Sequence, residues 1–381
     1  MIYLDHNATT PLHPRVLQEM LPFLQERWGN PSSPHRLGAD ARQALDQARE
    51  RIARRLQCRP EELIFCGSGT EADNLALRGV ARALRARGDG IVTSAIEHPA
   101  VLATCAALAA EGFRVTHVPV DGQGRVQPAA LAAALDEGTI LVSLMHANNE
   151  TGVLQPLAEL AELTRARGIV LHTDAVQTAG KVPLQPSLAG ADLITLSGHK
   201  LYGPKGIGVL VARAGTPLLP VIAGGGQEQG RRSGTENVAA IVGLAAALEL
   251  VTADLAAEAA REGELRELLE TQVRQRLAGV TIHGAGAPRV PGTSSLSFTG
   301  VDGESLVLGL DLQGICVSTG SACSTGDPEP SHVLLAMGVP PRQAQGTIRI
   351  SLGRETRAED ITRTVDALVD TVERLRRISS I

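Results

Sequence analysis

The sequence has few aromatic residues, no closely spaced cysteine pair and no long hydrophobic run. Only 2% of its 381 residues are Phe, Trp or Tyr, so we expect an aliphatic core. The five cysteines are odd in number and contain no C-x-x-C pair, which argues against a disulfide framework and a structural zinc site. Ten histidines without H-E-x-x-H spacing also predict that there is no metal site.

Charge and hydropathy restrict the partners that the chain can bind. The net charge is −5, and Lys and Arg are scattered, so we expect no surface for nucleic acid or an anionic membrane. No basic start followed by an apolar stretch opens the sequence, and no apolar run approaches the roughly 20 residues of a membrane helix. We therefore expect a cytoplasmic protein that binds a small molecule or another protein.

Residues 62–212 alternate between short apolar runs and helical patterns. Seven runs, among them "GIVTSA", "FRVTHVPV" and "TILVSLMH", are continuous, as is typical of strands buried on both faces. The segments between them carry apolar residues at helical spacing and stop at Gly. This rhythm predicts an α/β fold with a mostly parallel sheet covered by helices.

The rest of the chain predicts a smaller α+β unit. Residues 235–277, rich in Ala, Leu, Glu and Arg, favour long helices of the kind that bridge domains. They precede a strand at "GTSSLSF", a helix at "GESLVLGLDLQG", a strand at "TIRISLG" and a closing helix over 358–378. We place the large domain at 15–255 and the small domain at 1–14 and 256–381.

Polar residues that follow apolar runs are candidate site residues, because open α/β sheets bind ligands beyond the carboxyl ends of their strands. "CGSGTEADN", residues 66–74, is a glycine-rich turn that suits a phosphate, or merely a helix N-cap at Thr70 with Asp73 at the third position. Asp174 ends the run "GIVLHTD", with Gln177 three residues later. A buried carboxylate needs a cation or a strong donor, although a helix N-cap is the alternative interpretation.

Lys200 lies in the glycine-punctuated loop "SGHKLYGPKG", next to Ser197 and His199. Lysines at such sites form Schiff bases when buried, whereas a solvated loop lysine is the alternative. His98, in "AIEHPA", follows another strand and could stack on a cofactor ring and transfer protons. A phosphate turn, a strand-end Asp and a loop Lys together predict a site for pyridoxal 5'-phosphate.

These residues lie in motifs that resemble those of one known family. In chain order the motifs are "YLDHNATTP", "GNPSSPHRLG", "GSGTEADN", "EHPAV", "NNETG", "HTDAVQ", "SGHKLYGPKG", "RRSGTENV", "TGSACSTG" and "IRISLGR". The sequence resembles the cysteine desulfurases of the NifS/IscS type, which are pyridoxal-phosphate enzymes of the class V aminotransferase group. The resemblance covers nearly the whole chain and implies the fold type I of pyridoxal-phosphate-dependent transferases.

The resemblance implies roles around the cofactor ring. Lys200 would bind the cofactor covalently and move the Cα proton of the substrate. Asp174 would pair with the pyridine nitrogen, Gln177 would hydrogen-bond the ring oxygen, and His98 would stack on the ring.

It also implies residues for the phosphate and the substrate. The phosphate would be bound by Gly69, Thr70, Ser197, His199 and, from a second subunit, Thr235, so a homodimer is implied. Asn149 and Arg349 would hold the carboxylate of L-cysteine. A guanidinium suits this role because two of its N–H groups match the two carboxylate oxygens. Family members usually have a small or amide residue near position 6; here it is His6, and we expect this end not to touch the chemistry.

Cys323 lies among small, polar residues in "STGSACSTGDP". The resemblance implies that it takes the sulfur of L-cysteine as a persulfide and leaves L-alanine. Its loop, at about 318–330, would deliver sulfur to acceptor proteins such as an iron–sulfur scaffold. Cys323 could also make a transient iron–sulfur contact there. We hypothesise that His98 helps to ionise this thiol. The cysteines in or beside apolar runs are expected to be inert; they are Cys58, Cys66, Cys105 and Cys316.

Two other kinds of function stay open from the residues. A selenocysteine lyase or a class V aminotransferase would keep the cofactor but would not strictly need Cys323. A non-catalytic scaffold would need neither Lys200 nor Asp174.

Overall fold

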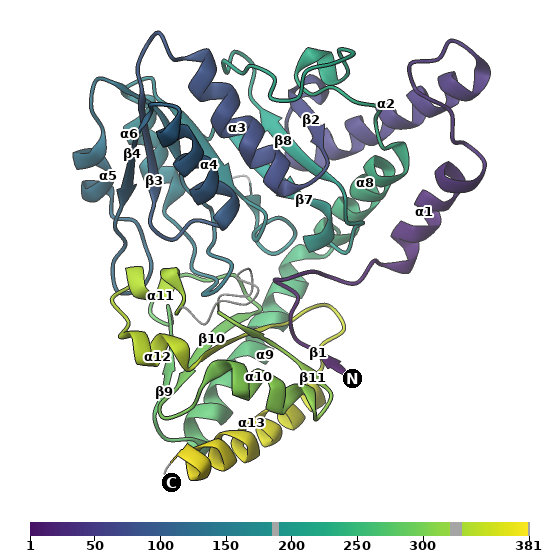
Figure 1. Ribbon diagram of the computed structural model, residues 1–381. Coiled ribbons are helices and arrows are strands. Elements are labelled where there is room, and N and C mark those ends of the chain that lie inside the picture. The colour runs from purple at the N-terminus through teal and green to yellow at the C-terminus, as the bar shows by residue number, and fades with distance from the viewer. Residues whose placement is uncertain (185–189, 321–329, 380–381) are drawn as a thin grey trace.

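A seven-stranded sheet organises the upper unit of the molecule (Figure 1). The computed structural model describes residues 1–184, 190–320 and 330–379. The sheet order is β2-β8-β7-β6-β5-β3-β4, in which β8 runs antiparallel to both of its neighbours. The strands are β2 (Leu63–Cys66), β3 (Gly90–Ser94), β4 (Arg114–Val118), β5 (Thr139–Ser143), β6 (Val170–Asp174), β7 (Leu193–Ser197) and β8 (Gly208–Ala212). The predicted mostly parallel α/β sheet is therefore confirmed.

Burial along the strands follows their place in the sheet. Every residue of β2, β3, β5, β6, β7 and β8 is buried, as expected for strands covered on both faces. The expectation is wrong for β4, most of whose side chains are partly or fully exposed. It pairs with β3 alone, so it forms an edge that helices cover incompletely.

Two apolar layers hold helices against the sheet. Alternate residues such as Ile64 and Leu210 pack with α3 (Gly69–Ala83) and α4 (Pro99–Ala110). Their neighbours, such as Phe65 and Val209, face the other layer. That layer contains α1 (Pro14–Gln25), α2 (Arg36–Leu56), α5 (Pro128–Ala134), α6 (Leu157–Arg165) and α8 (Val238–Thr252).

The start of α3 differs from its predicted N-cap. Ser68, not Thr70, caps the helix: its hydroxyl accepts a hydrogen bond from the backbone N–H of Glu71 at 3.0 Å. The Glu71 carboxylate in turn accepts the backbone N–H of Gly67 at 2.7 Å. The cap thus lies two residues before the predicted one, and Thr70 lies in the first turn of the helix.

The lower unit is built on a four-stranded antiparallel sheet of order β12-β13-β10-β9. Its strands are β9 (Val280–Ile282), β10 (Thr293–Phe298), β12 (Ser318–Thr319) and β13 (Thr347–Ser351). Its helices are α9 (Leu255–Arg276), α10 (Gly303–Asp311), α11 (His332–Ala336), α12 (Pro341–Gln345) and α13 (Ala358–Ser379). The strands and helices expected here are present; β9, β12, α11 and α12 are too short for a periodic pattern to predict.

Helices α8 and α9 connect the two units. The predicted helical stretch is broken at Ala253–Asp254, where the helices bend by 70°. No single helix in the described ranges is long and apolar enough to cross a membrane; α8 and α9 qualify only as this bent pair. The break falls near the boundary placed at residue 255, and the exact domain limits stay a prediction.

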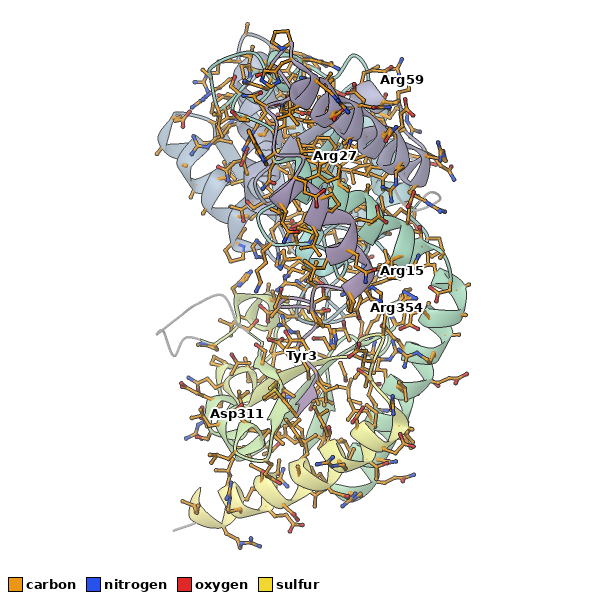
Figure 2. The ribbon with its side chains drawn as sticks, turned by 90° about the vertical axis from the view of Figure 1, so that its right-hand side faces the viewer. Tyr3, Arg15, Arg27, Arg59, Asp311 and Arg354 are labelled. Atoms are coloured by element: carbon orange, nitrogen blue, oxygen red, sulfur yellow. The ribbon has the colours of Figure 1, made fainter. Side chains whose placement is uncertain are left out.

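The N-terminal segment also joins the units. Strand β1 (Ile2–Tyr3) pairs in parallel with β11 (Ile315–Cys316) in the lower unit, and the chain then rises to α1 (Figure 1). Figure 2 shows Tyr3 and Arg354 near the junction, Arg27 in the upper unit and Asp311 in the lower one.

Gly208 is the closest approach of β8 to the start of α3. A Cβ atom at this position would lie 2.3 Å from the carbonyl oxygen of Ser68 and 2.8 Å from the amide nitrogen of Gly69. We expect Gly208→Ala to lower the free energy of unfolding by about 1–3 kcal/mol, measured by denaturant unfolding. Gly263→Ala is the control, because a Cβ there meets nothing within 4 Å and helix α9 should gain up to about 1 kcal/mol. An unchanged midpoint for Gly208→Ala would show that the backbone yields freely.

Candidate active site

Lys200 follows β7 on a short 3-10 turn, Gly198–Lys200, at the carboxyl end of the sheet. Its Nζ donates hydrogen bonds to the backbone oxygens of Asn7 and Ala8, both at 2.6 Å. The expectation that the N-terminal end lies away from the chemistry is therefore wrong. His6 is buried beside this contact, and its pKa is lowered to about 4, mainly because burial disfavours the imidazolium.

Asn7 lies in contact with Lys200, and the sequence did not single it out. Its backbone N–H donates to Ser351 Oγ at 2.9 Å, and its Nδ2 donates to Thr293 Oγ1 at 3.0 Å and to the Asn149 carbonyl at 3.1 Å. These bonds tie the lower sheet to the Lys200 turn through one residue. The partners are hundreds of positions away in sequence, so no local pattern could have revealed them.

The structure brings Asp174, His98 and Lys200 together. Asp174 ends β6, and its buried Oδ1 accepts the backbone N–H of Val176 at 2.9 Å. Burial raises the pKa of its carboxyl, while the charges of His98 and Lys200 and the Val176 N–H oppose that rise. Asp174 is thus a buried carboxylate near the Lys200 ammonium, and it would suit a protonated ring nitrogen.

Two further buried acids lie near Asp174 and were not predicted as site residues. Asp73, in α3, has a pKa well above the usual range because of burial and the charge of Asp174. Glu97 has its pKa raised to about 8, mainly by burial. Neither acid has a cationic neighbour comparable to Lys200, whose charge acts on Asp174. We therefore assign protons to Asp73 and Glu97 and the negative charge to Asp174.

His98 is held by its place at the start of α4. Its Nδ1 accepts the backbone N–H of Ala100 at 3.1 Å, so the neutral ring carries its proton on Nε2. The pKa of His98 is lowered by burial and by the charges of Lys200 and His332, against the opposing effect of Asp174. The ring is therefore neutral near pH 7.

Three of the predicted phosphate residues, Gly69, Thr70 and Ser197, lie at the first turn of α3. A Cβ on Gly69 would lie 3.3 Å from Ser197 Cβ and from Val176 Cγ2, so glycine leaves a recess at this helix N-terminus. Thr70 is exposed at its rim. His199 is half-buried; its Nδ1 lies 3.1 Å from Thr9 Oγ1, and burial lowers its pKa to about 4.

Arg349 lies on β13 and is only 2% exposed. Its guanidinium donates to Asp5 Oδ1 at 2.7 Å and to the backbone oxygen of Asn149 at 3.1 Å. Its Nε is buried with no hydrogen-bond partner in the described part of the chain. Arg349 and the backbone of Asn149 therefore lie in contact, and the Nε of Arg349 is a donor left over for an anion.

Cys323 lies outside the described residues, within 321–329. The flanking residues are near the Arg349 site, because Ser318 pairs with Arg349 across β12 and β13. Ser331 Oγ donates to the buried Glu150 at 2.5 Å. Burial raises the pKa of the thiols of Cys58, to about 11, of Cys105, to about 12, and of Cys66, as expected for inert cysteines.

Thr235 is exposed on the segment before α8. Arg232 of that segment forms an ion pair with Glu71, in the first turn of α3, at 2.7 Å. The loop thus begins beside the phosphate recess and ends on the surface.

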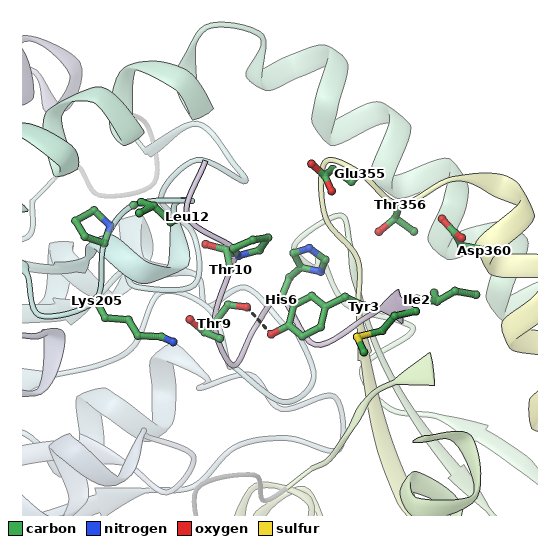
Figure 3. A pocket seen from close by; sticks show the side chains of 14 residues that line it. Ile2, Tyr3, His6, Thr9, Thr10, Leu12, Lys205, Glu355, Thr356 and Asp360 are labelled. Carbon is green, nitrogen blue, oxygen red and sulfur yellow. Dashed lines mark hydrogen bonds between the residues drawn. The ribbon is translucent and has the colours of Figure 1, made fainter. Parts of the chain in front are cut away.

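Two hollows lie on either side of the N-terminal segment. A small one of about 20 Å³, behind Lys200, is lined by Lys181, Glu262 and His6, among others. A larger one of about 710 Å³ lies on the outer side, where Tyr3 Oη donates to the Thr9 carbonyl at 2.8 Å (Figure 3). Among the described residues, no group of His, Cys, Asp and Glu could hold a metal ion.

Comparison with known proteins agrees with this geometry. The family model described as "Aminotransferase class-V" matches residues 2–364. The chain is 47% identical over 378 residues to the cysteine desulfurase IscS of Dictyoglomus turgidum, covering 99% of this chain and 96% of the relative. Among solved structures, a NifS-like protein superposes with a TM-score of 0.91 at 39% identity, covering 98% of this chain and 99% of the other.

A second solved structure, described as "SspA in complex with cysteine", has a TM-score of 0.82 at 33% identity and covers 92% of this chain and 99% of the other. The likeness thus extends over the whole sequence and both units of the fold, and not over one motif. The chain belongs to the class V aminotransferase family and, within it, to the pyridoxal-phosphate-dependent cysteine desulfurases of the IscS and NifS-like type.

Proposed function

We propose that this protein removes sulfur from L-cysteine, giving L-alanine and a persulfide on Cys323. The observation that carries this is the meeting of Lys200, Asp174 and His98 at the carboxyl edge of a sheet that matches cysteine desulfurases from end to end. Cysteine bound to the SspA structure supports the substrate.

The residues present fit pyridoxal phosphate. The recess at Gly69 can accept the phosphate at the α3 N-terminus, beside Ser197. Asp174 is a buried carboxylate that would pair with the ring nitrogen, and Gln177 Nε2, which donates to the Asn7 carbonyl at 3.0 Å, would bond the ring oxygen. When bound, the cofactor withdraws electrons from the Cα of an amino acid.

The chain's own residues would then act in turn. Lys200 Nζ, which donates to the Asn7 and Ala8 carbonyls, would hold the cofactor covalently and would carry the Cα proton of the substrate. Arg349 and Asn149 hold the substrate carboxylate, which the unpartnered Nε of Arg349 favours. Neutral His98 presents its Nε2–H to the site as a proton donor.

Sulfur transfer needs no outside oxidant. The Cys323 thiolate attacks the substrate sulfur; the S–S bond forms as the C–S bond breaks, and the electron pair stays with the substrate. The proton released by the Cys323 thiol then adds at Cβ, and the proton held by Lys200 returns to Cα. This completes L-alanine and accounts for the atoms of one cysteine and one thiol. We further propose that acceptor proteins, such as an iron–sulfur scaffold, receive the sulfur.

Two further properties belong to this proposal, a homodimer and a cytoplasmic location. A homodimer would allow the exposed Thr235 of one subunit to reach the phosphate recess of the other. A cytoplasmic location accords with unpaired cysteines in the sequence.

We expect Lys200→Ala to lose the visible absorption of the holoenzyme and to slow alanine formation by at least about 10²-fold, because covalent attachment and a proton carrier are both removed. Absorption spectra and alanine released from L-cysteine measure the two effects. Lys205→Ala is the matched control, since this lysine is exposed five positions further on. An active, coloured Lys200→Ala enzyme would contradict the assignment.

Cys323→Ser should retain the cofactor spectrum and its change on adding L-cysteine but form no protein persulfide, detected by mass spectrometry. Cys58→Ser serves as control, because burial raises the pKa of that thiol to about 11. Alanine production at the full rate by Cys323→Ser would favour a selenocysteine lyase or an aminotransferase instead.

His98→Asn should preserve the cap of α4 and yet slow alanine formation by about 10²-fold, because the ring N–H is lost. Since the pKa of His98 lies below its ordinary value, the wild-type rate should not fall through protonation of this ring near pH 6.5. A rate equal to wild type in His98→Asn would remove the ring from proton transfer.

A further inference from the structure

Lysine is rare in this chain, and two of its lysines meet at the active site. Of 36 Lys and Arg residues, the lysines are Lys181, Lys200 and Lys205. Lys205 is exposed, whereas Lys181 and Lys200 are half-buried. Arginine supplies every other fixed cation, so a lysine at 181 suggests a need for a compact ammonium that donates from one point.

Lys181 contacts two residues that touch the Lys200 site. Its Nζ donates to Asn7 Oδ1 at 2.8 Å and to Gln177 Oε1 at 3.1 Å. Because an ammonium only donates, the oxygen of the Gln177 carboxamide must face Lys181. The amide nitrogen then points the other way, where Nε2 donates to the Asn7 carbonyl at 3.0 Å. That same carbonyl accepts from Lys200 Nζ.

The surroundings keep Lys181 in place as a cation. Burial lowers the pKa of Lys181 to about 8, and the charges of Lys200 and Arg349 act in the same direction. The charge of Glu262, from α9, opposes that shift and favours the ammonium form. Lys181 also lines the small cavity next to Lys200, together with Glu262 and Arg354.

We propose that Lys181 is a positioning residue that sets the orientation of the Gln177 carboxamide. This inference rests on the proposed function, because it assigns Gln177 to the ring oxygen of pyridoxal phosphate. That oxygen carries negative charge, so it is stabilised by the amide N–H and repelled by the amide oxygen. A carboxamide free to turn would present the wrong atom in part of the population.

The experiment measures pyridoxal phosphate itself. We expect Lys181→Met to raise the Kd for the cofactor about tenfold and to shift the visible absorption maximum of the holoenzyme, because both report on the ring oxygen. Lys205→Met, the matched control, should change neither. In a Gln177→Met background the further change Lys181→Met should have little effect on Kd, since no carboxamide is left to orient.

If Lys181 had a purely structural role, Lys181→Met would raise the Kd for the cofactor by the same factor in the wild-type and the Gln177→Met backgrounds, and that result would overturn the proposal. An unchanged Kd and spectrum in Lys181→Met would overturn it as well. If Lys181→Met does not fold, Lys181→Gln carries the test: its shorter, uncharged side chain cannot reach both oxygens, so Kd should rise about threefold. An unchanged Kd and spectrum there would likewise overturn it. Wild-type protein that binds no cofactor would instead contradict the proposed function.

Discussion

The contact on which the site depends is that between Lys200 Nζ and the backbone oxygens of Asn7 and Ala8. A lysine ammonium inside a protein needs acceptors, and here the N-terminal segment supplies them before any ligand does. The same segment binds the lower sheet through Ser351 and Thr293. One residue, Asn7, thus joins the Lys200 turn of the large sheet to the β10–β13 pair that carries Arg349.

Charge in the site is controlled by burial as much as by pairing. Three carboxyls, Asp73, Glu97 and Asp174, lie below the surface on the same side of the sheet, and like charges at such depth cannot all ionise. Asp174 has the charge of Lys200 near it and so keeps the negative charge. The histidines nearby are neutral because burial lowers their pKa, which leaves the cations of the site to lysine and arginine.

The groups that would bind the cofactor and those that would bind the substrate come from different units of the fold. The large sheet holds the groups that would bind the cofactor, on short turns directly after buried strands. Arg349 and the approach to Cys323 belong to the small sheet, where β12 and β13 pair at Ser318 and Arg349. In the proposed function, the groups that would hold the substrate therefore come from one unit and those that would hold the cofactor from the other, and the N-terminal segment contacts both.

The sequence by itself determined the alternation of strands and helices, the parallel sheet, and the candidates Lys200, Asp174 and His98, because buried strands and the turns after them leave local patterns. Motif order also determined the family, and with it the expected roles of Cys323 and Arg349. Only the tertiary structure decided that residues 5–8 lie against Lys200, that Ser68 caps α3, that β4 is an exposed edge, and that Lys181 holds Gln177. Those facts depend on contacts between distant segments and on competition among neighbouring caps, for which hydropathy and spacing along one chain contain no signal.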